Sequence, residues 1–393
     1  MRSPGRAVCL VRQGYFPGEA RVRREAQALH DAGFRVDVVC LRGPGEPARE
    51  HVDGVDVHRL RLQHRRAGLG RSLYEYAVFF VLATARVSRL YARRRYSVVQ
   101  VNTMPDVLVF CALVPRLFGA RIILDMQEVM PELFSSKFGG RHAWLIRLLV
   151  RQEAAAAGFA DAVIAVSDPT RTVVERRGIP AAKLTVVMNS ADERLFSPRP
   201  RRVARAADDL VLVTHGTLIE GYGFETAIRA MPSVVAAIPR ARLQVVGGGE
   251  YASELVALAE RLGVAASVEF LGHRVLDDIP AILAEADVGI VPNELPGFTD
   301  VVVPTKLMEL VAMGVPAVAA RSSAVEHYFD PSMVASYSVG DAEDLAATVI
   351  ELARDPEKRV SYAQNAMRVL ERHGWRRMSY DYTQLISKLA SVG

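Results

Sequence analysis

Short runs of Val, Ile and Leu alternate with longer amphipathic stretches along the chain, and the alternation occurs in two separate series. Such apolar runs are typical of buried strands, and the amphipathic stretches between them are typical of crossover helices. The pattern therefore predicts α/β layers around mostly parallel sheets. In the first series the expected strands are 7–11, 36–40, 98–101, 122–124 and 162–166, with a helix near 19–32. In the second they are 210–213, 243–246, 268–271, 288–291 and 316–318.

Two domains are expected, because 393 residues exceed what one hydrophobic core usually serves. The Pro/Arg-rich stretch 197–202 stands between the two series, so we place a first domain at 1–197 and a second at 198–374. The predicted fold class is α/β, with two doubly wound Rossmann-like domains that face a central cleft. Ligands of such sheets bind beyond the carboxyl ends of the strands.

Basic residues gather on both sides of the apolar run 73–85. The net charge is +5, and the local excess consists of Arg61, Arg65, Arg66 and Arg71 before the run and Arg86, Arg89, Arg93, Arg94 and Arg95 after it. The run is too short to span a bilayer, which takes roughly 20 apolar residues. Two interpretations are open: contact with an anionic membrane surface, or a core-facing helix with a solvated arginine end. No binding of nucleic acid is expected.

The expected location is the cytoplasm, with peripheral contact to the inner face of the membrane under the first interpretation. No secretory leader is recognisable at residues 1–5. Cys9, Cys40 and Cys111 lie in apolar contexts without metal-ligand spacing, so they are expected to be reduced core thiols.

The segment Pro304–Glu309, closed by Gly314, predicts a short helix whose start binds an anion. Pro304 suits the first helical position, and Gly314 supplies a left-handed stop. The free backbone N–H groups and the Lys306 ammonium would face a diphosphate. Glu309 lies on the same helix face, where its carboxylate can accept from two ribose hydroxyls. The alternative is an ordinary capped surface helix with a weak i,i+3 ion pair.

Three glycine-containing loops follow expected strands. The run Gly247–Gly249 opens a helix, where glycines let the backbone approach a ligand, although a tight turn explains such a run equally well. A second glycine-bounded loop, 215–223, also connects a strand to a helix. In the first series the loop 14–18 has the same position, where it either lines the cleft or forms a plain connection.

Metal chemistry and covalent catalysis have little support in the sequence. The nine histidines form no metal-ligand spacing, so neither a metal nor a cofactor is expected. No serine elbow or Cys/His constellation indicates a covalent intermediate. The acid/base candidates are Asp125, Glu128 and Glu132, after the strand 122–124, with helix caps or loop carboxylates as the alternative.

Taken together, these segments resemble the GT-B glycosyltransferases of family 4 over nearly the whole chain. Residues 25–29 and 33–36 are similar to the family's first helix and second strand, and 188–196 is similar to its interdomain Asn-Gly-x-Asp…Phe signature, with serine in place of glycine. The loop 216–223, the run 247–249, the segment 270–273 and the helix start at 304–309 follow in the family's order. The resemblance also implies that 375–393 form a helix crossing back to the first domain.

The resemblance implies a retaining transfer of a hexose-type sugar from a UDP- or GDP-sugar to a hydroxyl acceptor. The acceptor is a glycolipid, a polysaccharide intermediate or a secondary metabolite. The nucleotide sugar is a substrate, and no metal takes part. The departing diphosphate itself takes the acceptor proton, so no protein nucleophile is required, and the protein supplies preorganised positive charge.

The resemblance also implies residue roles: Glu309 holds the ribose, the backbone at His273 and Arg274 meets the base, and Lys306 neutralises the diphosphate. The implied donor-binding residues are Gly216, Thr217, Tyr222, Gly248, Gly249, His273, Arg274, Thr305, Lys306, Leu307 and Glu309. The implied acceptor-binding residues are Gly14, Tyr15, Phe16, Asn102 and Gln127. The implied catalytic residues are Lys306, Glu309, Gln127 and Glu128.

The chain departs from the family pattern at several of these positions. Thr217 and Tyr222 replace a frequent Arg and Lys, and Val301 stands where a second Glu is frequent. Asn102 and Gln127 stand where histidines are frequent, and amides do not exchange protons near neutral pH. Two alternatives therefore stay open: a catalytically silent sugar-nucleotide-binding partner protein, and a GT-B UDP-sugar epimerase.

Overall fold

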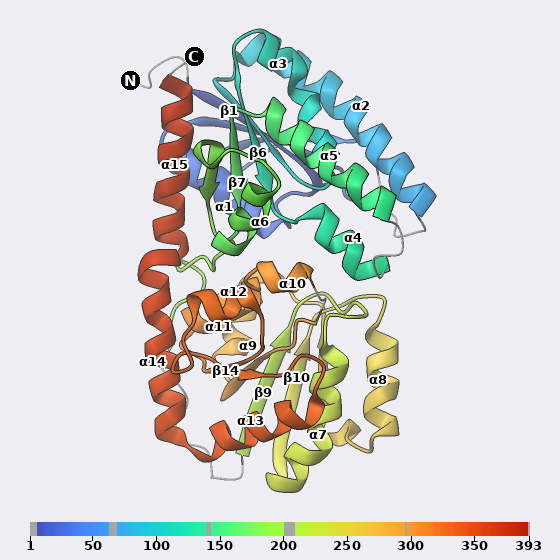
Figure 1. Cartoon of the computed structure of the whole chain (residues 1–393), viewed down its shortest axis with the longest axis vertical. Helices are drawn as coiled ribbons and strands as arrows, with labels where there is room; N and C mark the ends of the chain where they lie inside the picture. Colours follow the sequence, from blue (N-terminus) through green and yellow to red (C-terminus); the bar gives the residue numbers. More distant parts are fainter. Residues whose placement is uncertain (1–5, 63–68, 139–142, 200–208, 295–296, 392–393) are drawn as a thin grey trace. The chain divides into compact units, whose positions relative to one another are not determined.

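The computed structural model describes residues 6–62, 69–138, 143–199, 209–294 and 297–391, and the chain forms two compact α/β units (Figure 1). The first unit comprises the chain up to Val187 together with the segment from Met378 onward, and the second comprises Met188–Arg377. Residues 1–5, Arg65, Arg66 and part of the Pro/Arg-rich stretch lie outside the described residues. The division comes earlier than the expected boundary at 197, because the segment after the last strand of the first sheet belongs to the second unit.

An eight-stranded sheet forms the first unit, in the order β3-β4-β2-β1-β5-β6-β7-β8. Its strands are parallel except for the edge pair β3/β4. The bounds are β1 Ala7–Tyr15, β2 Arg35–Leu41, β3 Arg49–Val52, β4 Val55–Leu60, β5 Val98–Asn102, β6 Arg121–Met126, β7 Ala162–Ala165 and β8 Leu184–Val186. The five strands expected here are confirmed. The apolar pattern misses β3, β4 and β8, because β3 and β4 mix charged residues into the strand and β8 is very short.

Helices connect these strands and, with the C-terminal helix, complete the first unit. They are α1 Ala20–Asp31, α2 Leu69–Arg94, α3 Leu113–Leu117, α4 Met130–Phe138, α5 Ala143–Phe159, α6 Asp168–Arg176 and α15 Trp375–Ser391, with 3₁₀ turns η1 Asp106–Ala112 and η2 Ala181–Lys183. β1 is longer than expected, because its parallel pairing with β2 extends to Tyr15 opposite Leu41. Gly14 and Tyr15, which the sequence places in a loop, therefore end the strand.

The second unit has a six-stranded sheet in the order β11-β10-β9-β12-β13-β14, and every pair is parallel. Numbered within the unit, this is the order 3-2-1-4-5-6 of doubly wound nucleotide-binding domains, whose ligands bind at the switch point between the first and fourth strands. The bounds are β9 Asp209–His215, β10 Arg240–Val246, β11 Val268–Gly272, β12 Val288–Val291, β13 Ala317–Ala320 and β14 Ala335–Tyr337. The five expected strands are confirmed, and the short β14 is missed by the pattern. The switch point lies between the ends of β9 and β12.

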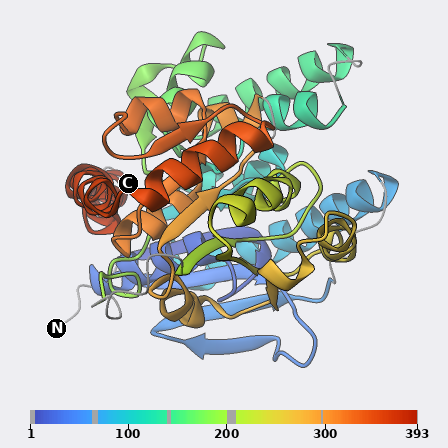
Figure 2. The same cartoon turned by 90° about the horizontal axis from the view of Figure 1, so that it is seen from below.

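Helices cover both faces of the second sheet (Figure 2). On one face, α7 and α13 pack together and α8 joins them, burying a core with side chains of β9, β10 and β12. On the other face, α11 packs on β12 and β13 and contacts α14. The bounds are α7 Phe224–Ala237, α8 Ala252–Arg261, α9 Ile279–Leu283, α10 Phe298–Val301, α11 Thr305–Ala312, α12 Ser323–Tyr328, α13 Ala342–Arg354 and α14 Pro356–His373, with 3₁₀ turns η3 Ala265–Ser267 and η4 Leu276–Asp278. α11 is thereby fixed against the middle of the sheet.

Candidate functional site

The start of α11 is an open helix N-terminus at the carboxyl edge of the second sheet. Pro304 has φ −62° and ψ 126°, so it is the N-cap residue rather than the first helical residue, and Thr305 begins the helix. This corrects the expected position of Pro304 by one residue, because its extended ψ does not continue a helix. Gly314, at φ +68°, ends the helix as expected. No side chain caps α11, and the Leu307 N–H donates to Pro304 O at 3.0 Å, so the N–H groups of Thr305 and Lys306 are the ones available to an anion.

Lys306 is half-buried against the loop that follows β9. Its Nζ lies 4.8 Å from the centroid of the Phe224 ring, a cation–π contact. A Cβ placed on Gly216 would lie 3.3 Å from the same Nζ, so this glycine leaves room for the ammonium. Burial lowers the pKa of the Lys306 ammonium to about 8, and the nearby Glu309 carboxylate partly opposes that shift. A desolvated cation at a helix start is suited to bind a phosphate.

Glu309 is buried and contacts His215, the last residue of β9. The distance between His215 Nε2 and Glu309 Oε2 is 2.6 Å, and the two residues are 6% and 7% exposed. Within the described part of the chain the Glu309 carboxylate makes this hydrogen bond and forms no ion pair with Lys306. The arrangement is therefore not the exposed i,i+3 pair that the alternative interpretation requires. His215 is a contact of the candidate site that the sequence did not single out.

The glycine-containing loops that follow β9, β10 and β11 pack against one another at the same edge. The Leu218 N–H donates to Gly248 O at 3.1 Å, and the Gly247 N–H donates to Gly272 O at 2.9 Å. A Cβ on Gly247 would collide with the carbonyl oxygen of Gly216, and a Cβ on Gly249 would collide with that of Leu218. Close backbone approach thus explains these glycines. The structure brings Gly216, Gly248 and Gly249 together with His273, whose Cβ is 3.4 Å from a Cβ placed on Gly248.

The remaining donor-side residues differ in exposure. Thr217, His273 and Arg274 are exposed, and Thr305 is half-buried. Tyr222 packs against the apolar core of the second unit, so its ring is a structural contact in addition to any contact with a ligand. Leu307, which was expected to bind the donor, is fully buried and its N–H donates to Pro304 O at 3.0 Å, so its role is to hold the first turn of α11.

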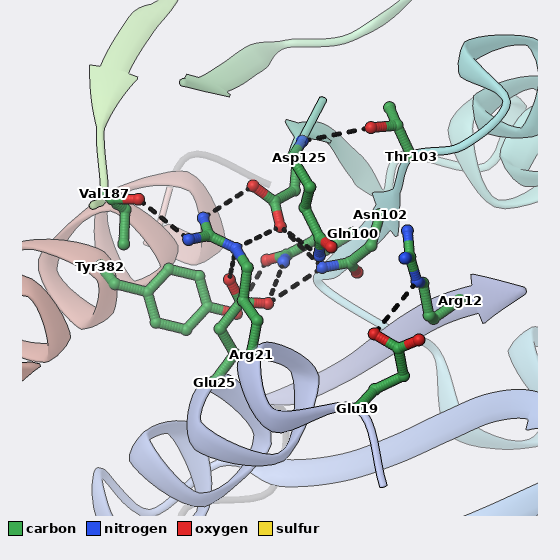
Figure 3. A network of polar contacts seen from close by, with 11 residues as sticks. Arg12, Glu19, Arg21, Glu25, Gln100, Asn102, Thr103, Asp125, Val187 and Tyr382 are labelled. Atoms are coloured by element: carbon green, nitrogen blue, oxygen red, sulfur yellow. Dashed lines mark hydrogen bonds and ion pairs between the residues drawn. The ribbon is translucent and has the colours of Figure 1, made fainter. Parts of the chain in front are cut away.

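A buried polar network occupies the carboxyl edge of the first sheet (Figure 3). Arg21 on α1 donates to both carboxylate oxygens of Asp125, from Nε at 2.9 Å and from Nη2 at 2.8 Å, and its Nη1 donates to Val187 O at 3.0 Å. Asn102 Nδ2 donates to Asp125 Oδ2 at 2.7 Å and to Glu25 Oε2 at 3.0 Å. Asn102 and Asp125 are fully buried. Asn102, expected to bind an acceptor, is therefore engaged inside the unit, as is the acid/base candidate Asp125.

The network continues to the C-terminal helix through Glu25 and Gln100. Gln100 Nε2 donates to Glu25 Oε2 at 2.7 Å, and the Tyr382 hydroxyl of α15 donates to Gln100 Oε1 at 2.7 Å (Figure 3). Burial, reinforced by the charge of Asp125 and opposed by Arg21, raises the pKa of Glu25 to about 8. The grouping of these four residues, Arg21, Glu25, Gln100 and Tyr382, was not predicted from the sequence. The polar Gln100 inside an otherwise apolar strand is the sequence feature that could have indicated a buried polar network.

Gln127 and Glu128 follow the end of β6 and are half-buried. The Gln127 N–H donates to Thr103 Oγ1 at 3.1 Å, and its Nε2 donates to Asp125 Oδ2 at 3.2 Å. Glu132 instead pairs with Arg177, whose Nη1 also donates to Glu153 Oε2 at 2.9 Å. The expected acid/base candidates thus separate: Asp125 is engaged in the buried network, Glu132 pairs with Arg177, and Glu128 follows the strand end beside Gln127.

The residues expected at the first loop have different environments. Gly14 is buried, and a Cβ there would lie 2.6 Å from Glu19 Oε1. Phe16 is 3% exposed, and its carbonyl oxygen accepts from Arg59 Nη2 at 3.2 Å. Tyr15, the last residue of β1, is half-buried.

The described residues also bear on metal binding and on membrane insertion. In the ranges that the structure describes, no three His, Cys, Asp or Glu residues are grouped so as to hold a metal ion. No helix in those ranges combines the length and apolar character needed to cross a bilayer. The three cysteines are unpaired and buried, as predicted.

Comparisons with known proteins agree with this architecture. Residues 18–190 match the family model of the glycosyl transferase 4-like domain, and residues 209–355 match that of the glycosyl transferases group 1. The GDP-mannose-dependent alpha-(1-6)-phosphatidylinositol monomannoside mannosyltransferase of Mycolicibacterium smegmatis is 31% identical over 242 residues, which are 59% of this chain and 62% of that relative. The Mycobacterium tuberculosis protein of the same name is 32% identical over 213 residues, 51% and 54% of the two chains. The matches thus span between about half and two thirds of these relatives.

Solved structures share the fold over nearly the whole chain. Sucrose-phosphate synthase from Thermosynechococcus elongatus aligns with a TM-score of 0.82 at 19% identity and covers 99% of this chain and 100% of that one. Anabaena HepE in complex with UDP-glucose aligns with a TM-score of 0.73 at 20% identity, covering 97% and 99%. At these identities the likeness concerns the fold, which is GT-B. On its two family-model matches, the chain belongs to the group 1, GT4-like glycosyltransferases of the GT-B fold.

Proposed function

We propose that the chain is a retaining glycosyltransferase that moves a hexose-type sugar from a UDP- or GDP-sugar to a hydroxyl acceptor. The observation that carries the proposal is the α11 start, where a desolvated ammonium at Lys306 and a buried carboxylate at Glu309 lie beside glycine loops at the sheet's carboxyl edge. The mycobacterial relatives are named for GDP-mannose, and HepE was solved with UDP-glucose. These names support a nucleotide-sugar donor of either base.

In this proposal the second unit binds the donor. The first N–H groups of α11, at Thr305 and Lys306, receive the phosphates together with the Lys306 ammonium, and the Leu307 N–H holds the turn by donating to Pro304 O. Glu309 accepts from the ribose hydroxyls, which lie one helical turn away from the phosphates. The backbone of Gly216, Gly248 and Gly249 approaches the nucleotide closely, with Thr217 and Tyr222 in the neighbouring loop. The base lies near His273 and Arg274, which are exposed at the end of β11.

The chemistry follows from charge development on the leaving group. The bond between the anomeric carbon and the diphosphate oxygen breaks while a bond to the acceptor oxygen forms on the same face, and the leaving phosphate takes the acceptor proton. Lys306 and the helix N–H groups stabilise the growing negative charge because they are fixed before the reaction. Gln127, Glu128 and Tyr15 in the first unit orient the acceptor through hydrogen bonds. No metal is assigned a role.

The acceptor in this proposal is a glycolipid, a polysaccharide intermediate or a secondary metabolite, met at the inner face of the membrane. Helix α2 buries Phe79 and Ala83 at 0% exposure, while Tyr74 and Val81 are 56% and 63% exposed. Arg86 lies near Arg49 and Arg89, and burial together with these like charges lowers its pKa. An outward apolar stripe beside a group of arginines is suited to reversible contact with anionic lipid.

A calorimetric panel of UDP, GDP, TDP and ADP, each with and without Mg²⁺, tests the donor site on wild type and on Glu309→Ala. We expect one nucleotide to bind selectively, without dependence on Mg²⁺, and to bind at least tenfold more weakly to the variant, because a charged hydrogen-bond partner is lost. Turnover is then followed with the matching nucleotide sugars and acceptor extracts. A protein that binds and consumes none of them would refute the proposal.

The same experiment separates the two alternatives. A sugar-nucleotide-binding partner protein would bind a donor without turnover in any extract, and the amides at Gln127 and Asn102 are the observation that favours it. A UDP-sugar epimerase would convert UDP-N-acetylglucosamine to its C2 epimer without an acceptor. Sugar transfer with retention of anomeric configuration excludes both.

A further inference from the structure

His215 ends β9 at the topological switch point, and its imidazole is almost completely enclosed. Its Nε2 lies 2.6 Å from Glu309 Oε2, across 94 positions of sequence. Its Nδ1 is buried and has no hydrogen-bond partner among the described residues. Because a carboxylate oxygen can only accept, the imidazole Nε2–H is the donor of this hydrogen bond.

We propose that His215 is a positioning residue for ribose recognition, and this inference depends on the proposed donor site. The imidazole holds one carboxylate oxygen of Glu309, Oε2, so that the other, Oε1, is presented to the ribose hydroxyls. A carboxylate with one oxygen fixed has lost most of its rotational freedom before the ligand arrives, which reduces the entropy cost of binding.

The second effect of His215 concerns Lys306. Positions 306 and 309 are neighbours on the helix surface, where Lys and Glu side chains ordinarily pair. Here Lys306 Nζ lies over the Phe224 ring and beside Gly216, and Glu309 is held by His215 instead. The imidazole thus keeps the carboxylate away from the ammonium, so the carboxylate serves the ribose and the ammonium serves the diphosphate. Without His215, the two charges are free to pair and to neutralise each other.

The test measures the ribose contribution to binding. Dissociation constants are compared for the preferred nucleoside diphosphate and for its 2′-deoxy and 3′-deoxy forms, on wild type and on His215→Ala, His215→Phe and His215→Gln. For wild type we expect the loss of a recognised hydroxyl to weaken binding about tenfold, the value for a hydrogen bond to a charged group. In His215→Ala and His215→Phe we expect the ratio of the deoxy to the parent dissociation constant to fall to within about twofold of one. The donor KM rises in these variants with little change in kcat.

The variants distinguish positioning from a loss of folding. His215→Phe preserves ring volume without a donor, and His215→Gln retains a donor, so discrimination should return partly in the Gln variant alone. His327→Ala, an exposed histidine on α12, is the matched control and should keep the wild-type ratio. Retention of the wild-type ratio in a folded His215→Phe protein would overturn the inference while leaving the proposed function intact. Failure of wild type to bind any nucleoside diphosphate would overturn both.

Discussion

At the scale of single residues, Lys306 should make the affinity of the proposed donor site depend on pH. Burial lowers its folded-state pKa from 10.5 to about 8, so the ammonium that should bind a diphosphate is lost as pH rises through 8. A bound diphosphate favours the charged form, so binding above pH 8 requires proton uptake. The proposed donor site is therefore predicted to work best on the acid side of pH 8.

We expect the dissociation constant for the preferred nucleotide to rise up to about tenfold for each pH unit above 8, since each unit then costs about 1.4 kcal/mol. Calorimetry at pH 7.0 and 9.5, in buffers of different ionisation enthalpy, measures both the affinity and the proton uptake. Lys306→Arg is the control, because its guanidinium stays charged throughout this range. Equal affinity of wild type at both pH values would contradict a phosphate role for Lys306.

Asp106 gives a second prediction at this scale, now for stability. It is fully buried, neither carboxylate oxygen has a partner among the described residues, and burial raises its pKa from 3.8 to about 7. The folded state therefore binds more protons than the unfolded state between pH 4 and 7, so stability falls as pH rises through that window. Glu153, whose pKa is raised to about 8 by burial and by Asp106, extends the loss toward pH 8.

Asp106→Asn removes one of these buried acids, so its stability relative to wild type should improve with rising pH. Urea unfolding midpoints at pH 5 and pH 8 measure this difference. We expect the variant to gain at pH 8, by about 1 kcal/mol or more, compared with pH 5. Asp31→Asn, at an exposed position of α1, is the control for removal of a carboxylate. A difference that is the same at both pH values would show that Asp106 does not titrate as described.

At the scale of secondary-structure elements, one stripe of α15 attaches this helix to the first unit. Met378, Tyr382 and Ile386 recur at every fourth position and are buried, and the Tyr382 hydroxyl reaches Gln100 in β5. Tyr382→Phe should lower the free energy of unfolding by about 1–3 kcal/mol, because it leaves the buried Gln100 oxygen without a donor. Tyr380→Phe, whose ring is 56% exposed on the same helix, should change it by less than about 0.5 kcal/mol. Chemical denaturation of both variants tests the contrast, and equal effects would argue against a specific Tyr382 contact.

Helix α2 carries apolar side chains on its outward side as well as on its buried side. If the outward side contacts anionic lipid, Val81→Asp combined with Arg86→Glu and Arg89→Glu should weaken binding to phosphatidylglycerol vesicles by a factor of ten or more, at about 1 kcal/mol per basic residue. Val360→Asp, on a 52% exposed valine of α14, should leave it unchanged. Co-sedimentation in low and high salt measures the effect. If the fraction of wild-type protein that sediments with vesicles does not change with lipid charge or salt, α2 has a structural role only.

At the scale of the whole molecule, the first unit is assembled from two distant parts of the chain, whereas the donor-side residues all lie in one continuous part, Met188–Arg377. A chain ended at Arg377 lacks the α15 segment that carries Tyr382. We expect it to lose stability in the first unit and to lose sugar transfer, but to keep the nucleotide affinity of the full chain. Calorimetry and transfer assays on the truncated and full chains measure both properties. Equal loss of nucleotide affinity would mean that donor binding depends on the first unit.

Much of the fold could be predicted because its signals are local. The ten strands that were predicted are short apolar runs, and Pro304 and Gly314 mark the two ends of α11. The ten strands and the position of this helix were therefore found from the sequence. The strands that were missed, such as β3 and β14, are short or charged at the edges of their sheets, where burial does not impose an apolar pattern.

The sequence alone determined the two α/β units, the glycine loops and the placement of Lys306 and Glu309 on one helix. Helix and strand periodicities and turn preferences are set by neighbouring residues, so a local pattern is enough to predict them. The tertiary structure decided which partner each polar group takes. Glu309 pairs with His215 rather than with Lys306, Asn102 is engaged by Glu25 and Asp125, and Tyr382 reaches Gln100 across 282 positions. These partners are selected because polar groups that are buried together must satisfy one another's hydrogen bonds. The residues involved are far apart along the chain, so a local sequence pattern does not show that they will meet.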